Sequence, residues 1–166
     1  MVLPANAGEA ELDALFERLL QPDLENWEQI ERAIWREWSS SGSASMDLLL
    51  QRGRQAMSQG DHAKAIDHFT ALTDHAPEFA EGWNARATAY FGAERYSLSI
   101  ADIGRTLSLN PRHFGAMQGL GRILEELGQP ADALNAYEAA YAIHPHRDGL
   151  KEAIERLTKD TTGQDI

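Results

Sequence analysis

The sequence predicts an all-α protein built as a stack of helical hairpins, and two observations carry this prediction. First, residues of one kind recur every 34 positions: Pro77, Pro111 and Pro145 are equally spaced, and three further columns of small or large residues keep the same register. Second, apolar residues within each 34-residue unit recur at intervals of three and four, the spacing of one face of a helix. Helix pairs of this kind bury their apolar faces only by stacking on neighbouring pairs.

Three such units fit the chain, at residues 46–79, 80–113 and 114–147. Each unit ends at its proline, because proline disfavours helical backbone in the residue that precedes it. Gly60 and Gly128 mark the turn between the paired helices, where a left-handed backbone is best tolerated by glycine. The middle unit has Glu94 at this position, so its turn is expected to be less favourable.

A further pair of helices is predicted ahead of the repeats. Apolar residues at helical spacing lie on both sides of Pro22 and indicate a hairpin over residues 9–38. Trp35 lies 34 residues before Phe69, in the column of large residues, so the hairpin is expected to pack at the start of the stack. A Ser/Gly-rich linker over residues 39–45 joins it to the first repeat.

The two ends of the chain are predicted to differ. Residues 148–159 form a capping helix whose apolar face covers the last repeat, and residues 160–166 form a tail without periodicity. Residues 1–8 are a disordered start or the remnant of a signal peptide. Ala5-Asn6-Ala7 fits the small-x-small pattern that precedes signal-peptidase cleavage, which favours a periplasmic location slightly over a cytoplasmic one.

Composition excludes several classes of function. The 166 residues carry 15 basic and 26 acidic side chains, a formal net charge of −11. This charge argues against nucleic acid as a partner, because nucleic acid attracts Lys and Arg. No stretch is long and apolar enough for membrane insertion, and the lack of cysteine excludes disulfides. Catalytic motifs and metal-ligand spacings are also missing, so we expect no catalytic residue, no metal site and no cofactor.

Negative charge is concentrated near the N-terminus. Residues 1–40 contain nine acids and three arginines, a net charge of −6 on less than a quarter of the chain. Such a pattern is typical of a solvated helix face. The alternative is an electrostatic handle for a basic partner.

The repeated units resemble the tetratricopeptide repeat family. Gln59-Gly60-Asp61-His62 is similar to the start of the family's inter-helix turn, and the segment from Trp83 to Tyr90 resembles its first helix, with Arg86-Ala87 replacing a Leu-Gly pair. The resemblance covers the three repeats and implies a right-handed α-α superhelix. It also implies a non-enzymatic scaffold that binds a protein or an extended peptide in its concave groove.

In this family the first helix of each repeat lines the groove. The corresponding positions here combine cations, amides, a hydroxyl and apolar groups: Leu50, Arg54, Met57, Asn84, Thr88, Phe91, Gln118 and Arg122. Asn84 and Gln118 suit the backbone of an extended peptide, and Arg54 and Arg122 suit a carboxylate. Members that bind acidic chaperone tails use a Lys, Asn and Arg clamp, which is replaced here by Leu50, Arg54, Ala85, Gly115 and Gly119. That ligand is therefore not expected.

Three alternatives stay open. The stripe formed by Trp27, Ile34 and Trp38 is either a hydrophobic cover for the stack or a docking face for a partner or a second copy, giving a homodimer. The groove is either a binding surface or merely the solvated side of a rigid spacer. The protein is alternatively a cytoplasmic chaperone for a secreted substrate, since some three-repeat chaperones have similar length, acidity and an N-terminal dimerisation helix.

Overall fold

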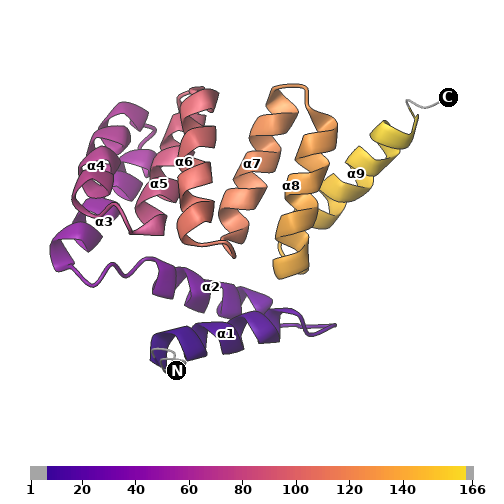
Figure 1. The fold of residues 1–166 in the computed structure, drawn as a ribbon, viewed down its shortest axis with the longest axis horizontal. Coiled ribbons are helices and arrows are strands. Elements are labelled where there is room, and N and C mark those ends of the chain that lie inside the picture. The colour runs from indigo at the N-terminus through magenta and orange to yellow at the C-terminus, as the bar shows by residue number, and fades with distance from the viewer. Residues whose placement is uncertain (1–6, 164–166) are drawn as a thin grey trace.

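The computed structural model describes residues 7–163, and this part of the chain consists of nine helices with no strand (Figure 1). The helices are α1 Ala7–Leu19, α2 Trp27–Trp38, α3 Ala44–Ser58, α4 His62–His75, α5 Ala80–Gly92, α6 Tyr96–Leu109, α7 Phe114–Glu126, α8 Pro130–Ile143 and α9 Leu150–Gly163. Helices α3 to α8 form three antiparallel pairs that stack in a row, and α9 packs on the last pair. The predicted all-α fold is confirmed.

The periodic columns are explained by close contact inside each helix pair. Gly121 of α7 faces the ring of Tyr137 in α8, and a Cβ atom at Gly121 would lie 2.6 Å from that ring. Gly53 faces Phe69 in the same way. The second pair has an alanine instead of glycine on α5, and there the opposing residue is the smaller Ile103. Small and large residues therefore vary together so that each pair stays tightly packed.

The turns inside the pairs use left-handed backbone. Gly60 and Gly128 have φ angles of +73° and +69°, as glycine permits. Glu94 adopts the same conformation at φ +57°. For a residue other than glycine the left-handed conformation costs about 1–2 kcal/mol. The turn at Glu94 therefore lowers the stability of the second pair.

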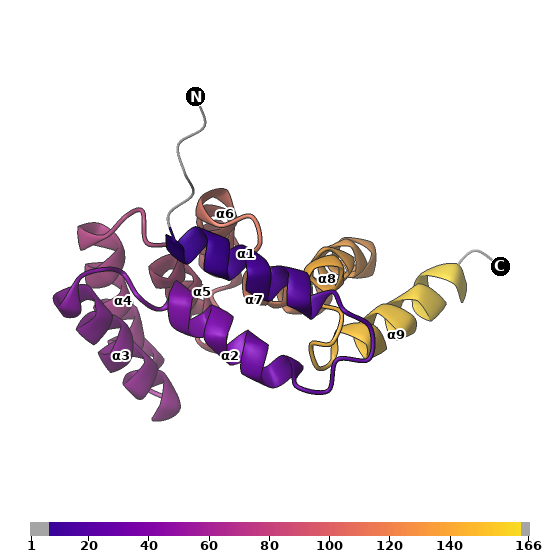
Figure 2. The ribbon, with the colours of Figure 1, turned by 90° about the horizontal axis from the view of Figure 1, so that it is seen from below.

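The hairpin of α1 and α2 does not lie at the start of the stack, so that prediction is wrong. It crosses the edge formed by the inter-repeat loops and packs on the third repeat (Figure 2). One core joins its buried Leu19 and Ile34 to Phe114 of α7 and to Leu150 of α9. The ring of Trp38 lies 4.9 Å from that of Phe114.

The first repeat is polar at the positions where a preceding helix pair would pack. Gln51 and Gln55 are exposed on α3, at the positions where the second repeat has the buried Ala85 and Ala89. Polar residues of this kind solvate the open end of a repeat stack. The hairpin therefore binds elsewhere, where buried aromatic residues are available.

The helix ends differ from the expected boundaries. Helix α1 begins at Ala7, within the segment predicted to be a disordered start, and α3 begins at Ala44, within the predicted linker. Helix α9 continues to Gly163, so the tail predicted from residue 160 begins too early. In the last turn of this helix the hydroxyl of Thr161 donates to the carbonyl of Leu157 at 2.8 Å. Most of the predicted cleavage motif, at residues 5–6, lies outside the described residues.

Candidate functional site

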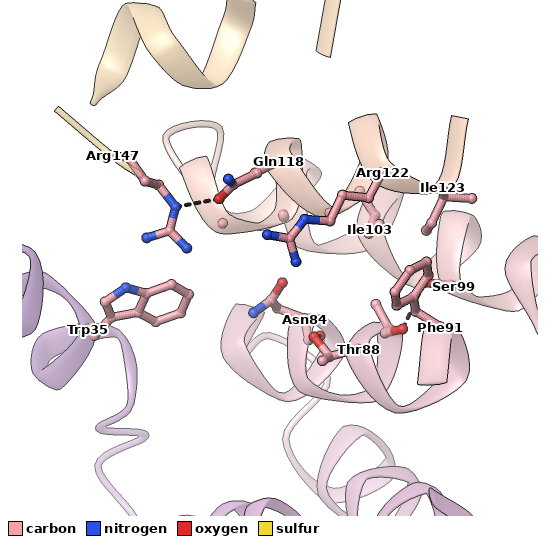
Figure 3. A pocket seen from close by; sticks show the side chains of 14 residues that line it. Trp35, Asn84, Thr88, Phe91, Ser99, Ile103, Gln118, Arg122, Ile123 and Arg147 are labelled. Carbon is pink, nitrogen blue, oxygen red and sulfur yellow. Dashed lines mark hydrogen bonds between the residues drawn. The ribbon is translucent and has the colours of Figure 1, made fainter. Parts of the chain in front are cut away.

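A cavity of about 210 Å³ lies between helices α2, α5 and α7 (Figure 3). Trp35 of α2 forms one wall, and Arg147, from the loop after α8, lies beside it. Five of the eight predicted groove residues meet in the lining: Asn84, Thr88, Phe91, Gln118 and Arg122. The inner faces of α5 and α7 therefore form an open space at the position where the repeat pattern puts the groove.

The three predicted groove residues of the first repeat lie elsewhere. Leu50 is 2% exposed and belongs to a core with Phe69, so its predicted place in the groove is wrong. Met57 packs on the same core. Arg54 forms an ion pair with Glu81 at 2.7 Å and is not in the cavity lining. Leu50 and Met57 of helix α3 thus contribute to the interior instead of to a ligand surface.

A buried carboxylate organises one side of the groove. Glu81 is 3% exposed and accepts hydrogen bonds from Arg54 at 2.7 Å, from the Asn84 amide at 3.3 Å and from His113 Nε2 at 2.9 Å. The other ring nitrogen of His113 accepts from the backbone N–H of Ala116, which places the imidazole proton on Nε2. One of the two amide N–H groups of Asn84 is therefore already in use, and the Asn84 oxygen is directed into the cavity in Figure 3.

A second carboxylate ties the hairpin to the repeats. Glu31 of α2 accepts hydrogen bonds from Arg147, from His144 Nε2 at 2.8 Å and from the Trp35 indole at 3.1 Å. Burial raises the pKa of the Glu31 carboxyl, but the bond from His144 and the charge and bond of Arg147 outweigh this effect and hold it at about 2. Glu31 is therefore ionised at neutral pH.

Arg147 links Glu31 of α2 to Gln118 of α7. Its Nε atom donates to the Gln118 oxygen at 2.5 Å, and the Gln118 nitrogen donates to the carbonyl of Asp148 at 3.2 Å. Glu31, Arg147 and Gln118 thus form a polar bridge from α2 to α7. Gln118 is occupied at both ends, which differs from its predicted role as a partner for a peptide backbone. The bridge also separates the cavity from a neighbouring hollow of about 230 Å³.

Trp35 was not anticipated as a groove residue. Its ring lies against α7 because Gly115 has no side chain: a Cβ atom there would be 2.8 Å from the indole. Edge-on contacts with His113 at 5.3 Å and with Phe114 at 5.8 Å hold the ring from behind. The signal in the sequence was Gly115, because glycine leaves room for another side chain on α7. No neighbouring residue indicated that Trp35 would fill this room.

The predicted docking stripe is turned inward. Ile34 is fully buried and Trp38 is 8% exposed, with the Trp38 ring stacked on His113 at 4.3 Å. Trp27 packs edge-on to His144 at 5.4 Å. Ile34 and Trp38 are therefore covered by the same chain, whereas Trp27 stays partly exposed. Of the two alternatives, this burial favours a hydrophobic cover.

The charged side chains that line the cavity are both positive, but within the described part of the chain only one of them has an ion-pair partner. Its lining contains Arg122 and Arg147 and no acidic residue. Arg147 is neutralised by Glu31, whereas Arg122 makes no ion pair or side-chain hydrogen bond with any of residues 7–163. Figure 3 shows Arg122 extending from α7 over the cavity. The described groove therefore presents a cation that is available to an anionic group.

The hydroxyl groups of the cavity are not arranged for nucleophilic chemistry. Thr88 donates to the carbonyl of Asn84 at 3.1 Å, and Ser99 donates to the carbonyl of Ala87 at 2.7 Å. Nucleophilic hydroxyls require a neighbouring general base, and these two bond to backbone instead. In residues 7–163 no three His, Asp or Glu side chains gather as metal ligands would, and none of the helices is long and apolar enough to cross a membrane.

Comparisons with known proteins agree on the repeat architecture. A family model described as tetratricopeptide repeat matches residues 50–102 and 84–148. A TPR repeat-containing protein of Rhizobium etli is 34% identical over 153 residues, which are 92% of this chain and 75% of that protein. The Hsp70-Hsp90 organizing protein of Triticum aestivum is 32% identical over 108 residues, but these span only 19% of its length.

Solved structures share the fold at low sequence identity. The first TPR of Spaghetti (RPAP3) bound to an HSP90 peptide has a TM-score of 0.67 and 21% identity, covering 70% of this chain and 93% of that chain. The Yersinia enterocolitica type III secretion chaperone SycD, in complex with a peptide of the translocator YopD, has a TM-score of 0.67 and 13% identity, covering 72% and 96%.

Proposed function

Because the chain belongs to the tetratricopeptide repeat family, we propose that it is a non-enzymatic adaptor that binds an extended segment of a partner protein in its groove. One observation carries the proposal: the cavity between α5, α7 and Trp35 gathers predicted groove residues from two repeats and remains open. Rigid helices hold these side chains, as a preformed binding surface requires.

The chemistry of the cavity suits a peptide. Phe91 and Trp35 provide apolar walls for a side chain, and the Asn84 oxygen is positioned to accept a backbone N–H. Arg122 supplies a charge-assisted donor for a carboxylate. The solved complexes of RPAP3 with an HSP90 peptide and of SycD with a YopD peptide support a peptide ligand for a fold of this shape.

A pull-down from cells that express the protein natively tests this function. We expect Arg122→Ala to reduce capture of the partner several-fold while the melting temperature stays unchanged, because Arg122 is exposed and makes no internal ion pair in the described chain. Arg95→Ala is the matched control, since Arg95 is also exposed but lies outside the cavity. Equal capture by wild type and both variants would contradict binding in the groove.

The alternative function has less support. A cytoplasmic chaperone for a secreted substrate was expected to dimerise through its N-terminal helices, yet the apolar stripe of α2 is occupied by the third repeat. A homodimer through the hairpin would require this contact to open. Export to the periplasm stays a prediction based on the N-terminal motif.

A further inference from the structure

The cavity has room for one aromatic ring. Its volume of about 210 Å³ exceeds the roughly 150 Å³ that suffice for benzene in an apolar protein cavity. The floor is bare backbone at Gly119, where an added Cβ atom would meet nothing nearer than Ile103 at 3.9 Å. Trp35 and Phe91 line two sides of the cavity, as Figure 3 shows.

The aromatic wall is fixed before any ligand arrives. The Trp35 indole N–H donates to Glu31 at 3.1 Å, and its ring rests on Gly115 of α7. The hairpin itself is held by a buried core that includes Ile34 and Phe114. A ring entering the cavity thus meets a wall that needs no reordering, which lowers the entropic cost of binding.

The charge next to this space selects an anion. The whole chain carries a net charge of −11, but the cavity lining has two arginines and no acid. Glu31 already satisfies Arg147, so Arg122 is the cation that a ligand would meet. A planar guanidinium binds a carboxylate through two parallel hydrogen bonds.

We propose that the cavity anchors an aromatic side chain of the partner that lies next to a carboxylate, with the ring between Trp35 and Phe91 and the carboxylate on Arg122. This inference rests on the proposed peptide-binding function and specifies its ligand. The carboxylate belongs to an acidic residue next to the aromatic residue, because the proposed ligand is an extended segment of the partner.

Four small probes separate the contribution of the aromatic ring from that of the carboxylate. N-acetyl-Phe-Glu-amide carries the carboxylate on a neighbouring side chain, and N-acetyl-phenylalanine carries it at the chain end. N-acetyl-phenylalaninamide lacks the carboxylate, and N-acetylalanine lacks the ring. Titration followed by ¹H–¹⁵N NMR is expected to move the Gly119 amide and the Trp35 indole signals with N-acetyl-Phe-Glu-amide. A response to N-acetyl-phenylalanine alone would overturn this source of the carboxylate. The amide probe should bind about tenfold more weakly, and N-acetylalanine should not bind.

Two variants test the two halves of the anchor. Gly119→Leu fills the cavity and should abolish binding without loss of thermal stability, because leucine is a better helix former than glycine and its Cβ atom fits. The matched control is Gly104→Leu on α6, a helical glycine where an added Cβ atom would have no neighbour within 4 Å and which lies outside the cavity. Arg122→Gln should bind N-acetyl-Phe-Glu-amide and N-acetyl-phenylalaninamide equally.

The anchor and the proposed function can fail separately. If the aromatic probes bind Gly119→Leu as well as wild type, or do not bind wild type at all, the anchor proposal is wrong. If capture of the partner in cells still depends on Arg122 in that case, the groove binds a peptide by another contact. Independence of capture from Arg122 would overturn the proposed function as well.

Discussion

The polar bridge predicts a pH-dependent attachment of the hairpin, with Glu31 as the titrating group. The partners of Glu31, His144 and Arg147, lie 113 and 116 residues away in sequence, so the carboxylate joins opposite ends of the chain. Glu31→Gln keeps the size of the side chain but removes the charge that these two groups face. We expect this variant to destabilise the packing of α1 and α2 on the third repeat at neutral pH.

The magnitude follows from the pKa of Glu31. A carboxyl with a pKa of 4.5 when unfolded and of about 2 when folded contributes about 3 kcal/mol while it is ionised in both states. The bridge is partly accessible to solvent, since Arg147 is 21% exposed, and screening reduces this to about 2 kcal/mol. Because the folded pKa is the lower one, the contribution is complete above about pH 4.5 and is lost as the pH falls toward 2.

Urea unfolding at several pH values between 7 and 2.5 measures this effect. Tryptophan emission is a suitable signal, because three of the four tryptophans, Trp27, Trp35 and Trp38, lie in the hairpin. Between pH 7 and 2.5 wild type should lose about 1.5 kcal/mol more than Glu31→Gln, because the folded pKa of about 2 lies just below this range. The control is Asp13→Asn, which removes an exposed ion pair with Arg112 and should change stability by about 0.5 kcal/mol or less. Parallel pH profiles of wild type and Glu31→Gln would refute the argument.

Two further predictions concern the packing of the repeats. Glu94→Gly should raise the free energy of unfolding by about 0.5–1 kcal/mol, because glycine relieves the left-handed strain at φ +57° but adds freedom to the unfolded chain; a lower urea midpoint would contradict this. Gly121→Ala should cost about 1–3 kcal/mol, because the new Cβ atom would lie 2.6 Å from the ring of Tyr137. Adding Tyr137→Ile copies the residue pair of the second repeat and should show a favourable coupling of at least about 1 kcal/mol, whereas simple additivity would rule out the contact as the cause.

The sequence pattern was sufficient for the repeats because their contacts are local. Gly121 and Tyr137, which pack against each other, are 16 positions apart. Equivalent small and large residues recur in each unit, so a periodic column reveals the contact. The hairpin has no such repetition. The spacing between Trp35 and Phe69 matched the period by coincidence, since Trp35 packs on Gly115 and not in the first repeat.

The groove was predictable in part, for the same reason. Helical periodicity indicates which side of α5 and α7 faces inward, and Asn84, Thr88 and Arg122 do line the cavity. It does not indicate which of these groups already has an internal partner. Gln118 is occupied by Arg147, a contact that depends on how a loop 29 residues away folds back. Such pairings are properties of the assembled chain, and no local pattern encodes them.

The position of the hairpin has a consequence for biosynthesis. Helix α2 ends at Trp38, but the surface that covers Ile34 and Trp38 includes Phe114 of α7 and Leu150 of α9. At a translation rate of about 5–20 residues per second, the ribosome needs on the order of 5–20 s to add the intervening residues. During this interval the apolar stripe of the nascent hairpin has no partner within its own chain. The last repeat and α9 therefore complete the fold of the segment that is synthesised first.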